Sequence, residues 1–194
     1  HDVAVMSREL MKHKKTTEYT TIWMDSLRDG KSQLVNTNKL VRHYKGATGL
    51  KTGTTQKAGH CLSATAQRDG MGLVAVILGC STTDKPYCGA PKMLDYGVAS
   101  YGNHTPQIGQ DQPTAAKVLR GVEPQVDITV ETPAPVLVKK GQEKAIVTTI
   151  ELAEDLEAPV LQGQVVGEVV LKLADKEVAT YPIRAAKADG AVNF

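Results

Sequence analysis

The sequence is poor in aromatic residues and cysteine, and it has no long hydrophobic run. Its 194 residues include one Trp, one Phe and six Tyr. No basic block alternates with these aromatics, which argues against binding of nucleic acid. No stretch has the length and apolarity of a signal-peptide core or a membrane-spanning helix. These absences leave a globular chain that is long enough for one large domain or two small ones.

The three cysteines, Cys61, Cys80 and Cys88, do not describe a disulfide framework because their number is odd. Cys61 and Cys80 fall in apolar strand patterns, where we expect buried free thiols. No two cysteines have the spacing of zinc ligands, and the five histidines are scattered along the chain. The sequence therefore predicts neither a metal site nor a cofactor.

The charges are unevenly distributed. Residues 1–105 hold 14 Lys and Arg against 8 Asp and Glu, a net charge of +6, whereas residues 106–194 hold 9 against 13, a net charge of −4. A basic N-terminal half suits an anionic substrate, although solvated surface lysines explain such an excess equally well.

The first 104 residues combine helix and strand patterns. Apolar residues at helical spacing cover residues 2–15, and an Asp29-Gly30 hairpin signal lies between short strand patterns at residues 20–24 and 31–35. We expect Trp23 to pack in the core. We expect residues 36–38, Asn-Thr-Asn, to form a turn through bonds from side chain to backbone.

Three longer strand patterns follow, at residues 48–55, 60–67 and 71–79, and we expect them to form an antiparallel meander. The third is apolar almost throughout, which is typical of a buried central strand. A loop at residues 81–86 leads to a helical pattern over residues 88–101, with Pro91 expected in its first turn.

The sequence pattern changes after residue 104, and this change indicates a second domain. We assign residues 1–104 to the first domain, residues 105–113 to a linker rich in Pro, Gln and Gly, and residues 114–194 to a small all-β sandwich. The expected strands of this sandwich are residues 126–130, 135–138, 145–150, 165–173 and 178–183. The fold class is therefore α+β, an antiparallel sheet with covering helices followed by an all-β domain.

The central motif is Lys51-Thr52-Gly53, followed by Thr54, in the first strand of the meander. Because side chains alternate along a strand, Lys51 and Gly53 point to one side and Thr52 to the other. A glycine leaves room for another chain against the backbone. A strand edge with a fixed positive charge and hydroxyls suits an extended peptide that ends in a carboxylate.

Lys-Thr-Gly is also the third signature of the penicillin-recognising serine acyltransferases. Its surroundings are residues 36–40 (Asn-Thr-Asn-Lys-Leu), 44–50 (Tyr-Lys-Gly-Ala-Thr-Gly-Leu) and 55–62 (Thr-Gln-Lys-Ala-Gly-His-Cys-Leu). With them the chain resembles the serine D-alanyl-D-alanine carboxypeptidases, the low-molecular-mass penicillin-binding proteins. Residues 156–167 resemble the C-terminal β-domain of that family. The resemblance implies a transpeptidase-like first domain that is present here as its C-terminal part.

The resemblance implies removal of the terminal D-alanine from peptidoglycan pentapeptides by a serine nucleophile, with β-lactams as imitators of the dipeptide. The family activates this serine with a lysine in a Ser-x-x-Lys motif and uses a second motif, Ser-x-Asn. Neither motif occurs in this sequence. We therefore expect a chain that is inactive alone, its nucleophile lying in an N-terminal segment of a longer protein.

The resemblance assigns site roles to four residues. Lys51 is the expected catalytic residue, shaping the field around the serine and the substrate carboxylate. Thr52 and Thr54 are candidates to bond that carboxylate, and the strand after Gly53 is expected to pair with the peptide, with a main-chain N–H helping to form the oxyanion hole.

Two positions depart from the family pattern. His60 stands where relatives often have Tyr. Tyr87 stands where relatives often have an arginine that assists the carboxylate; Lys85 is a candidate replacement for that charge, although lysine lacks the planar fork of arginine.

The resemblance also implies a location and partners. We expect an exported parent in the bacterial cell envelope, on the outer face of the cytoplasmic membrane, with an amphipathic anchor that this chain lacks. Its expected partners are the peptidoglycan stem peptide ending in D-Ala-D-Ala, β-lactam antibiotics and the N-terminal catalytic segment.

Three other interpretations stay open. One is a β-lactamase or transpeptidase on the same fold, against which the C-terminal β-domain argues. Another is a catalytically inactive protein that binds or scaffolds the cell wall, which the missing Ser-x-x-Lys favours. The third, a generic two-domain β protein, leaves the long match around Lys51 unexplained.

Overall fold

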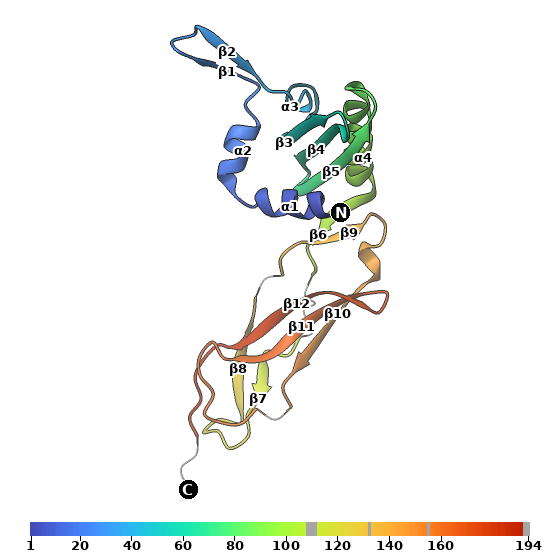
Figure 1. The fold of residues 1–194 in the computed structure, drawn as a ribbon. Coiled ribbons are helices and arrows are strands. Elements are labelled where there is room, and N and C mark those ends of the chain that lie inside the picture. Colours follow the sequence, from blue (N-terminus) through green and yellow to red (C-terminus); the bar gives the residue numbers. More distant parts are fainter. Residues whose placement is uncertain (108–111, 132, 155, 192–194) are drawn as a thin grey trace. The chain divides into compact units, whose positions relative to one another are not determined.

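The computed structural model describes residues 1–107, 112–131, 133–154 and 156–191. The chain divides into two compact units, His1–Gly102 and Asn103–Phe194, and strand β6 (Tyr101–His104) spans the division (Figure 1). The proposed linker at residues 105–113 includes residues 108–111, which lie outside the described residues.

The N-terminal unit begins with two helices, α1 (Asp2–Leu10) and α2 (Lys14–Thr20). The prediction of one helix over residues 2–15 is therefore wrong. The Leu10 carbonyl accepts hydrogen bonds from the His13 N–H (3.2 Å) and the Thr16 hydroxyl (3.1 Å). A side chain that competes for a backbone carbonyl in this way ends the helix and lets a new one start.

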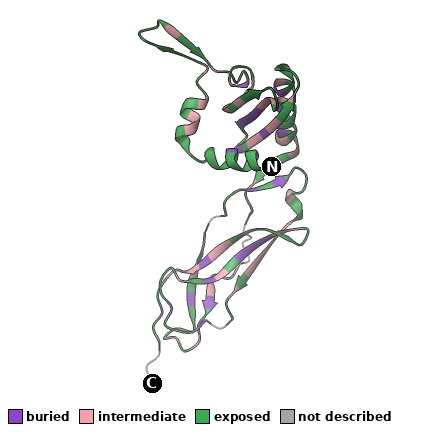
Figure 2. Cartoon of the chain, in the orientation of Figure 1, coloured by how far each residue is buried: buried purple, intermediate pink, exposed green. Residues whose placement is uncertain are grey.

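The predicted hairpin is present, although its first strand is shifted. Strand β1 (Met24–Leu27) pairs antiparallel with β2 (Ser32–Val35), and Asp29 and Gly30 turn the chain with positive φ. The first strand was expected at residues 20–24, but α2 extends to Thr20. The hairpin projects from this unit (Figure 1), and its residues are mostly exposed (Figure 2).

The predicted meander is confirmed as an antiparallel sheet in the order β3 (Ala47–Thr55), β4 (Gly59–Arg68), β5 (Met71–Cys80). The central strand is β4, so the prediction that residues 71–79 form it is wrong. In β5 the side chain of Leu78 is 62% exposed. An apolar run indicates a strand that is buried over part of its length, but it does not fix the position of that strand in the sheet.

Helices cover both faces of this sheet. On one face α4 (Asp84–Ser100) packs against β5 and β4, and the short helix α3 (Leu40–His43) packs against β3 (Figure 1). The buried residues of this core are Leu40, Leu62, Ala64, Ala66, Ala75, Ala90 and Leu94. On the other face α1 lies against β4, where the hydroxyl oxygens of Ser7 and Ser63 are 2.7 Å apart.

Helix α4 starts four residues earlier than the sequence predicted, at Asp84. The proline in its first turn is therefore Pro86, and Pro91 lies in the helix interior, contrary to the prediction. A proline is tolerated in the first turn because the N–H that it lacks has no partner there. Lys85 consequently belongs to α4 and not to a loop.

The C-terminal unit is all β, as predicted. Five strands form one antiparallel sheet in the order β10-β11-β12-β8-β7, and β9 lies outside that sheet. The strands are β7 (Ala115–Lys117), β8 (Gln125–Val130), β9 (Val136–Lys139), β10 (Ile146–Leu152), β11 (Val165–Leu173) and β12 (Lys176–Ala185), and a 3₁₀ turn (Glu143–Ala145) precedes β10. Leu156 and Val160, from the connection between β10 and β11, complete its buried core. Figure 2 shows buried residues along the strands of this unit.

Helices of the described residues are all too short or too polar to cross a membrane.

Candidate functional site

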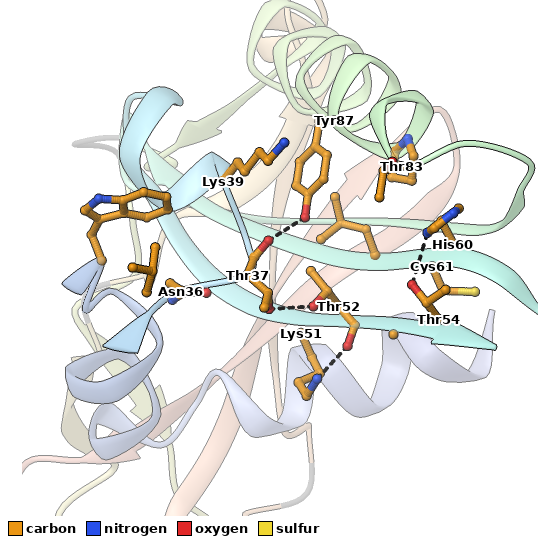
Figure 3. Close-up of a pocket in the computed structure, with 15 residues that line it drawn as sticks. Asn36, Thr37, Lys39, Lys51, Thr52, Thr54, His60, Cys61, Thr83 and Tyr87 are labelled. Carbon is orange, nitrogen blue, oxygen red and sulfur yellow. Dashed lines mark hydrogen bonds between the residues drawn. The ribbon is translucent and has the colours of Figure 1, made fainter. Parts of the chain in front are cut away.

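A pocket of about 640 Å³ lies in the N-terminal unit along strand β3 (Figure 3). Five parts of the chain build it: Trp23 before β1, the end of β2 with the segment that leads to α3, the middle of β3, the start of β4 and the start of α4. The lining residues are Trp23, Val35, Asn36, Thr37, Lys39, Lys51, Thr52, Gly53, Thr54, His60, Cys61, Leu62, Thr83, Pro86 and Tyr87. All four residues that the sequence singled out in β3 are among them.

The side chains of β3 alternate as expected (Figure 3). Thr52 and Thr54 both face the pocket, Thr52 toward the segment before α3 and Thr54 toward β4, where its hydroxyl lies 3.1 Å from Nδ1 of His60. The Lys51 side chain points away from them, and its Nζ donates a hydrogen bond to the Thr52 carbonyl (2.5 Å). The structure therefore brings both threonines to one wall and the lysine to the opposite side of the strand.

Lys51 also borders a second, apolar pocket of about 540 Å³ between α1 and β3. This pocket is lined by Val3, Met6, Ser7, Glu9, Leu10, His13, Leu50, Lys51 and Ser63. Met6 is 70% exposed and Leu10 is 46% exposed. The lysine therefore borders both pockets, one on each side of β3.

The segment between β2 and α3 is held by its own amides, as the sequence predicted. The Asn36 carboxamide oxygen accepts the Asn38 N–H (2.9 Å), and the Asn38 oxygen accepts the Leu40 N–H (3.2 Å). Asn38 is 1% exposed. Such side-chain to backbone bonds fix a turn, so this segment presents its remaining side chains from a defined backbone.

Thr37 has a role that the sequence did not indicate. Its hydroxyl oxygen lies 2.7 Å from that of Thr52, and its carbonyl accepts a hydrogen bond from the Tyr87 hydroxyl (2.6 Å). Thr37 thus joins β3 to α4. A side-chain partner 15 residues away gives no signal in a single sequence, which is why only the turn was predicted here.

Tyr87 is half-buried in the wall of the pocket. Burial raises the pKa of its hydroxyl, and a hydrogen bond from the Lys39 backbone partly offsets that rise. The Lys39 ammonium lies over the Tyr87 ring, 5.7 Å from its centroid. Tyr87 therefore holds the segment of Thr37 and Lys39 with both its hydroxyl and its ring.

Trp23 lines this pocket and does not belong to either buried core of the described residues, so the prediction of core packing is wrong. Its ring meets the edge of His43 at a centroid distance of 6.3 Å, and the Arg42 guanidinium lies 5.4 Å from its centroid. The indole N–H is buried and has no partner within the described residues. The fluorescence of Trp23, the only tryptophan of the sequence, can therefore report on the pocket.

The cysteines depart from the prediction too. All three are free, but Cys61 and Cys80 are half-buried and not buried. Cys61 lines the pocket at the start of β4.

Two family models match the chain. Residues 1–82 match the model described as D-alanyl-D-alanine carboxypeptidase. Residues 103–190 match the model described as penicillin-binding protein 5, C-terminal domain. The chain belongs to the D-alanyl-D-alanine carboxypeptidase family.

Curated relatives from this family match the chain over nearly its whole length. The D-alanyl-D-alanine carboxypeptidase DacF of Bacillus subtilis is 36% identical over 194 residues, which cover 97% of this chain and 49% of the relative. DacC of Escherichia coli is 28% identical over 184 residues, covering 94% of this chain and 46% of the relative. The chain therefore spans about half the length of the curated relatives it matches.

Solved structures agree on the fold. Penicillin-binding protein 5 of Haemophilus influenzae superposes with a TM-score of 0.76 over 97% of this chain and 56% of that chain, at 23% identity. The carboxypeptidase DacD of Francisella tularensis gives 0.57 over 83% of this chain and 40% of that chain, at 27% identity. The α+β fold with an all-β C-terminal domain is therefore that of this carboxypeptidase family.

The pocket departs from the expected charge pattern at one point. Lys85 was a candidate to replace the arginine expected at position 87, but it does not line the pocket. Its Nζ donates a hydrogen bond to Oγ of Ser81 (2.9 Å) instead. Since α4 begins at Asp84, Lys85 emerges from the first turn of the helix toward its own N-terminal loop.

Proposed function

We propose that this chain supplies the substrate-binding wall of a serine-type D-Ala-D-Ala carboxypeptidase, which trims the terminal D-alanine of peptidoglycan pentapeptides. The observation that carries the proposal is the placement of Lys51, Thr52, Gly53 and Thr54 along one pocket. Family membership supports it, as does the agreement between the sequence motif and the pocket.

Strand β3 offers a peptide an open edge. It is an end strand in the sheet order of the described residues, so only β4 pairs with it. An extended peptide can add to such an edge through main-chain hydrogen bonds, while pockets beside it accept side chains or a terminus. Gly53 has nothing within 4 Å of the place where a Cβ would stand, which leaves that part of the strand open.

In this proposal the two faces of strand β3 have different roles. Thr52 and Thr54 bond the substrate's terminal carboxylate from the pocket face. Lys51, on the other side of the strand, sets a positive field around the attacking serine. A main-chain N–H of the strand stabilises the oxyanion that forms when the D-Ala-D-Ala carbonyl is attacked.

The serine and its lysine base belong to motifs that this sequence does not contain. We therefore propose that the chain binds substrate and β-lactams weakly and does not turn over alone. We also propose an extracytoplasmic site of action in the cell envelope, because peptidoglycan is assembled there, with the β-domain as a stalk and contact surface.

The test is labelling with a fluorescent penicillin. This chain should remain unlabelled, and a longer form of the protein that carries Ser-x-x-Lys and Ser-x-Asn upstream should form a stable acyl-enzyme. Lys51→Ala in the longer form should abolish labelling. A longer form that carries both motifs and stays unlabelled would instead favour a catalytically inactive wall-binding protein.

A further inference from the structure

We propose that Lys39 is the second cation of the pocket and selects the substrate by its terminal carboxylate. This inference rests on the proposed function and assigns a specificity-determining residue to it. Its basis is the charge of the pocket and the way in which the structure fixes the Lys39 side chain.

The pocket lining is cationic. Among its residues, all of them described, Lys39 and Lys51 carry a permanent charge, and none is Asp or Glu. No carboxylate of the described residues forms an ion pair with Lys39, whereas Lys12, Arg68 and Arg184 have carboxylate partners. A positive charge without a carboxylate partner beside a pocket attracts an anionic group.

The backbone around Lys39 is fixed by five hydrogen bonds. The amides of Asn36 and Asn38 hold the turn before it. The carbonyl of Lys39 accepts N–H groups from the first turn of α3, those of Arg42 (3.2 Å) and His43 (3.3 Å). The Tyr87 hydroxyl bonds the Thr37 carbonyl, two residues before Lys39.

The side chain of Lys39 is positioned by the Tyr87 ring, over which its ammonium lies (Figure 3). Aromatic faces attract cations and still leave their remaining N–H groups free to bind an anion. Tyr87 thus replaces the expected arginine indirectly: it carries no charge, and it holds the charge of Lys39 at the wall of the pocket that both residues line. Tyr87 is in this sense a positioning residue.

Lys39 and Thr52 belong to the same wall. Thr37, two residues before Lys39, meets the Thr52 hydroxyl at 2.7 Å. Lys51, in contrast, points to the other side of β3. In this proposal a carboxylate held at Thr52 and Thr54 lies in the field of Lys39, which lines the same pocket, and Lys51 serves the reacting centre.

The experiment compares two ligands on the full 194-residue chain: an N-acetylated Lys-D-Ala-D-Ala peptide and its C-terminal carboxamide. Binding of each is measured by isothermal titration calorimetry or by NMR titration. The wild type should prefer the carboxylate form, and Lys39→Met should lower that preference by about fivefold without changing affinity for the carboxamide. Methionine retains the apolar stem over the Tyr87 ring and removes the charge.

Two controls sharpen the result. Lys39→Arg should keep the preference, and Lys85→Met, which removes a lysine outside the pocket, should leave both affinities unchanged. An unchanged preference in Lys39→Met overturns the inference and leaves the proposed function standing. A wild type that binds neither peptide overturns both. Increasing salt should weaken the preference more in the wild type than in Lys39→Met, which keeps only the charge of Lys51 in the pocket lining.

Discussion

The hydroxyl oxygens of Thr37 and Thr52 lie 2.7 Å apart and join two segments that carry the pocket. From Thr37 the chain of hydrogen bonds continues to Tyr87 on α4, and from the Thr52 carbonyl it continues to Lys51. The motif of β3 is therefore not an isolated strand feature. It is tied to the turn before α3 and, through that turn, to the helix that covers the sheet.

The first prediction concerns this pair. Thr37→Val and Thr52→Val remove one hydroxyl each while keeping a β-branched side chain. We expect a coupling free energy of about 0.5 kcal/mol in a double-mutant cycle, because an exposed side-chain hydrogen bond contributes at the low end of the usual range. Urea unfolding followed by circular dichroism measures it. A coupling near zero would show that the two hydroxyls do not act together.

The second prediction concerns Tyr87. Tyr87→Phe leaves the Thr37 carbonyl without its donor, so we expect a loss of about 1 kcal/mol in the free energy of unfolding at pH 7. Tyr96, 64% exposed on the same helix, offers the control Tyr96→Phe, which should be near neutral. Equal effects of the two substitutions would contradict the positioning role.

The third prediction is a pH dependence. The pKa of the Tyr87 hydroxyl is raised by burial above its ordinary value of 10.0, so the folded state keeps this proton more tightly than the unfolded state. The contribution of this group to the free energy of unfolding is fully present below pH 10.0 and is lost as the pH rises through the folded-state pKa. Tyr87→Phe should therefore lose less stability than the wild type above pH 10. Parallel losses in both proteins would refute this contribution.

The fourth prediction concerns a network at the far end of the sheet. Arg68 Nη1 donates to Asp95 Oδ1 (2.8 Å) and to the Tyr44 hydroxyl (3.0 Å), which itself donates to Asp95 (2.7 Å). We expect Asp95→Asn to cost about 0.5–1 kcal/mol, since the group is more than half exposed and solvent screens it. Asp127→Asn, which removes a single exposed partner of Lys187, should cost less. The reverse order in denaturant unfolding would contradict the network.

The fifth prediction concerns the apolar surface beside α1, where Met6 is 70% exposed. Exposed apolar surface of this kind promotes association. We expect the molar mass by light scattering to rise with protein concentration, and Met6→Gln to reduce the rise. Met93→Gln, on α4 with 50% exposure, is the control. A monomer at every concentration would count against it.

Much of this fold could be predicted from the sequence because its signals are local. The Asp29-Gly30 turn, the three strands of the meander and the strands β8 to β12 of the C-terminal unit follow from alternation and turn residues, whereas the short strand β7 was not predicted. The break between α1 and α2 could not be predicted, because it depends on a bond from Thr16 to Leu10 that competes with a helical pattern. The central place of β4 depends on pairing between strands, which an apolar run does not report.

The residues of the candidate site also fall into two groups, those with a local signal in the sequence and those without one. Lys51, Thr52, Gly53 and Thr54 carry a motif, so sequence reasoning could find them. The contributions of Lys39 and Trp23 arise only when the segment before α3 folds beside β3. Along the sequence, the cation nearest to position 87, where an arginine is expected, is Lys85. In space the cation at Tyr87 is Lys39, 48 positions away in the chain.

Binding of a D-Ala-D-Ala terminus along β3 can be measured directly through Trp23. This residue is the only tryptophan and it lines the pocket, so its fluorescence reports occupancy without a label. Titration with an N-acetylated Lys-D-Ala-D-Ala peptide should give a saturable change that Thr52→Val weakens several-fold. A flat titration, or an equal response to the L-Ala-L-Ala peptide, would contradict the claim.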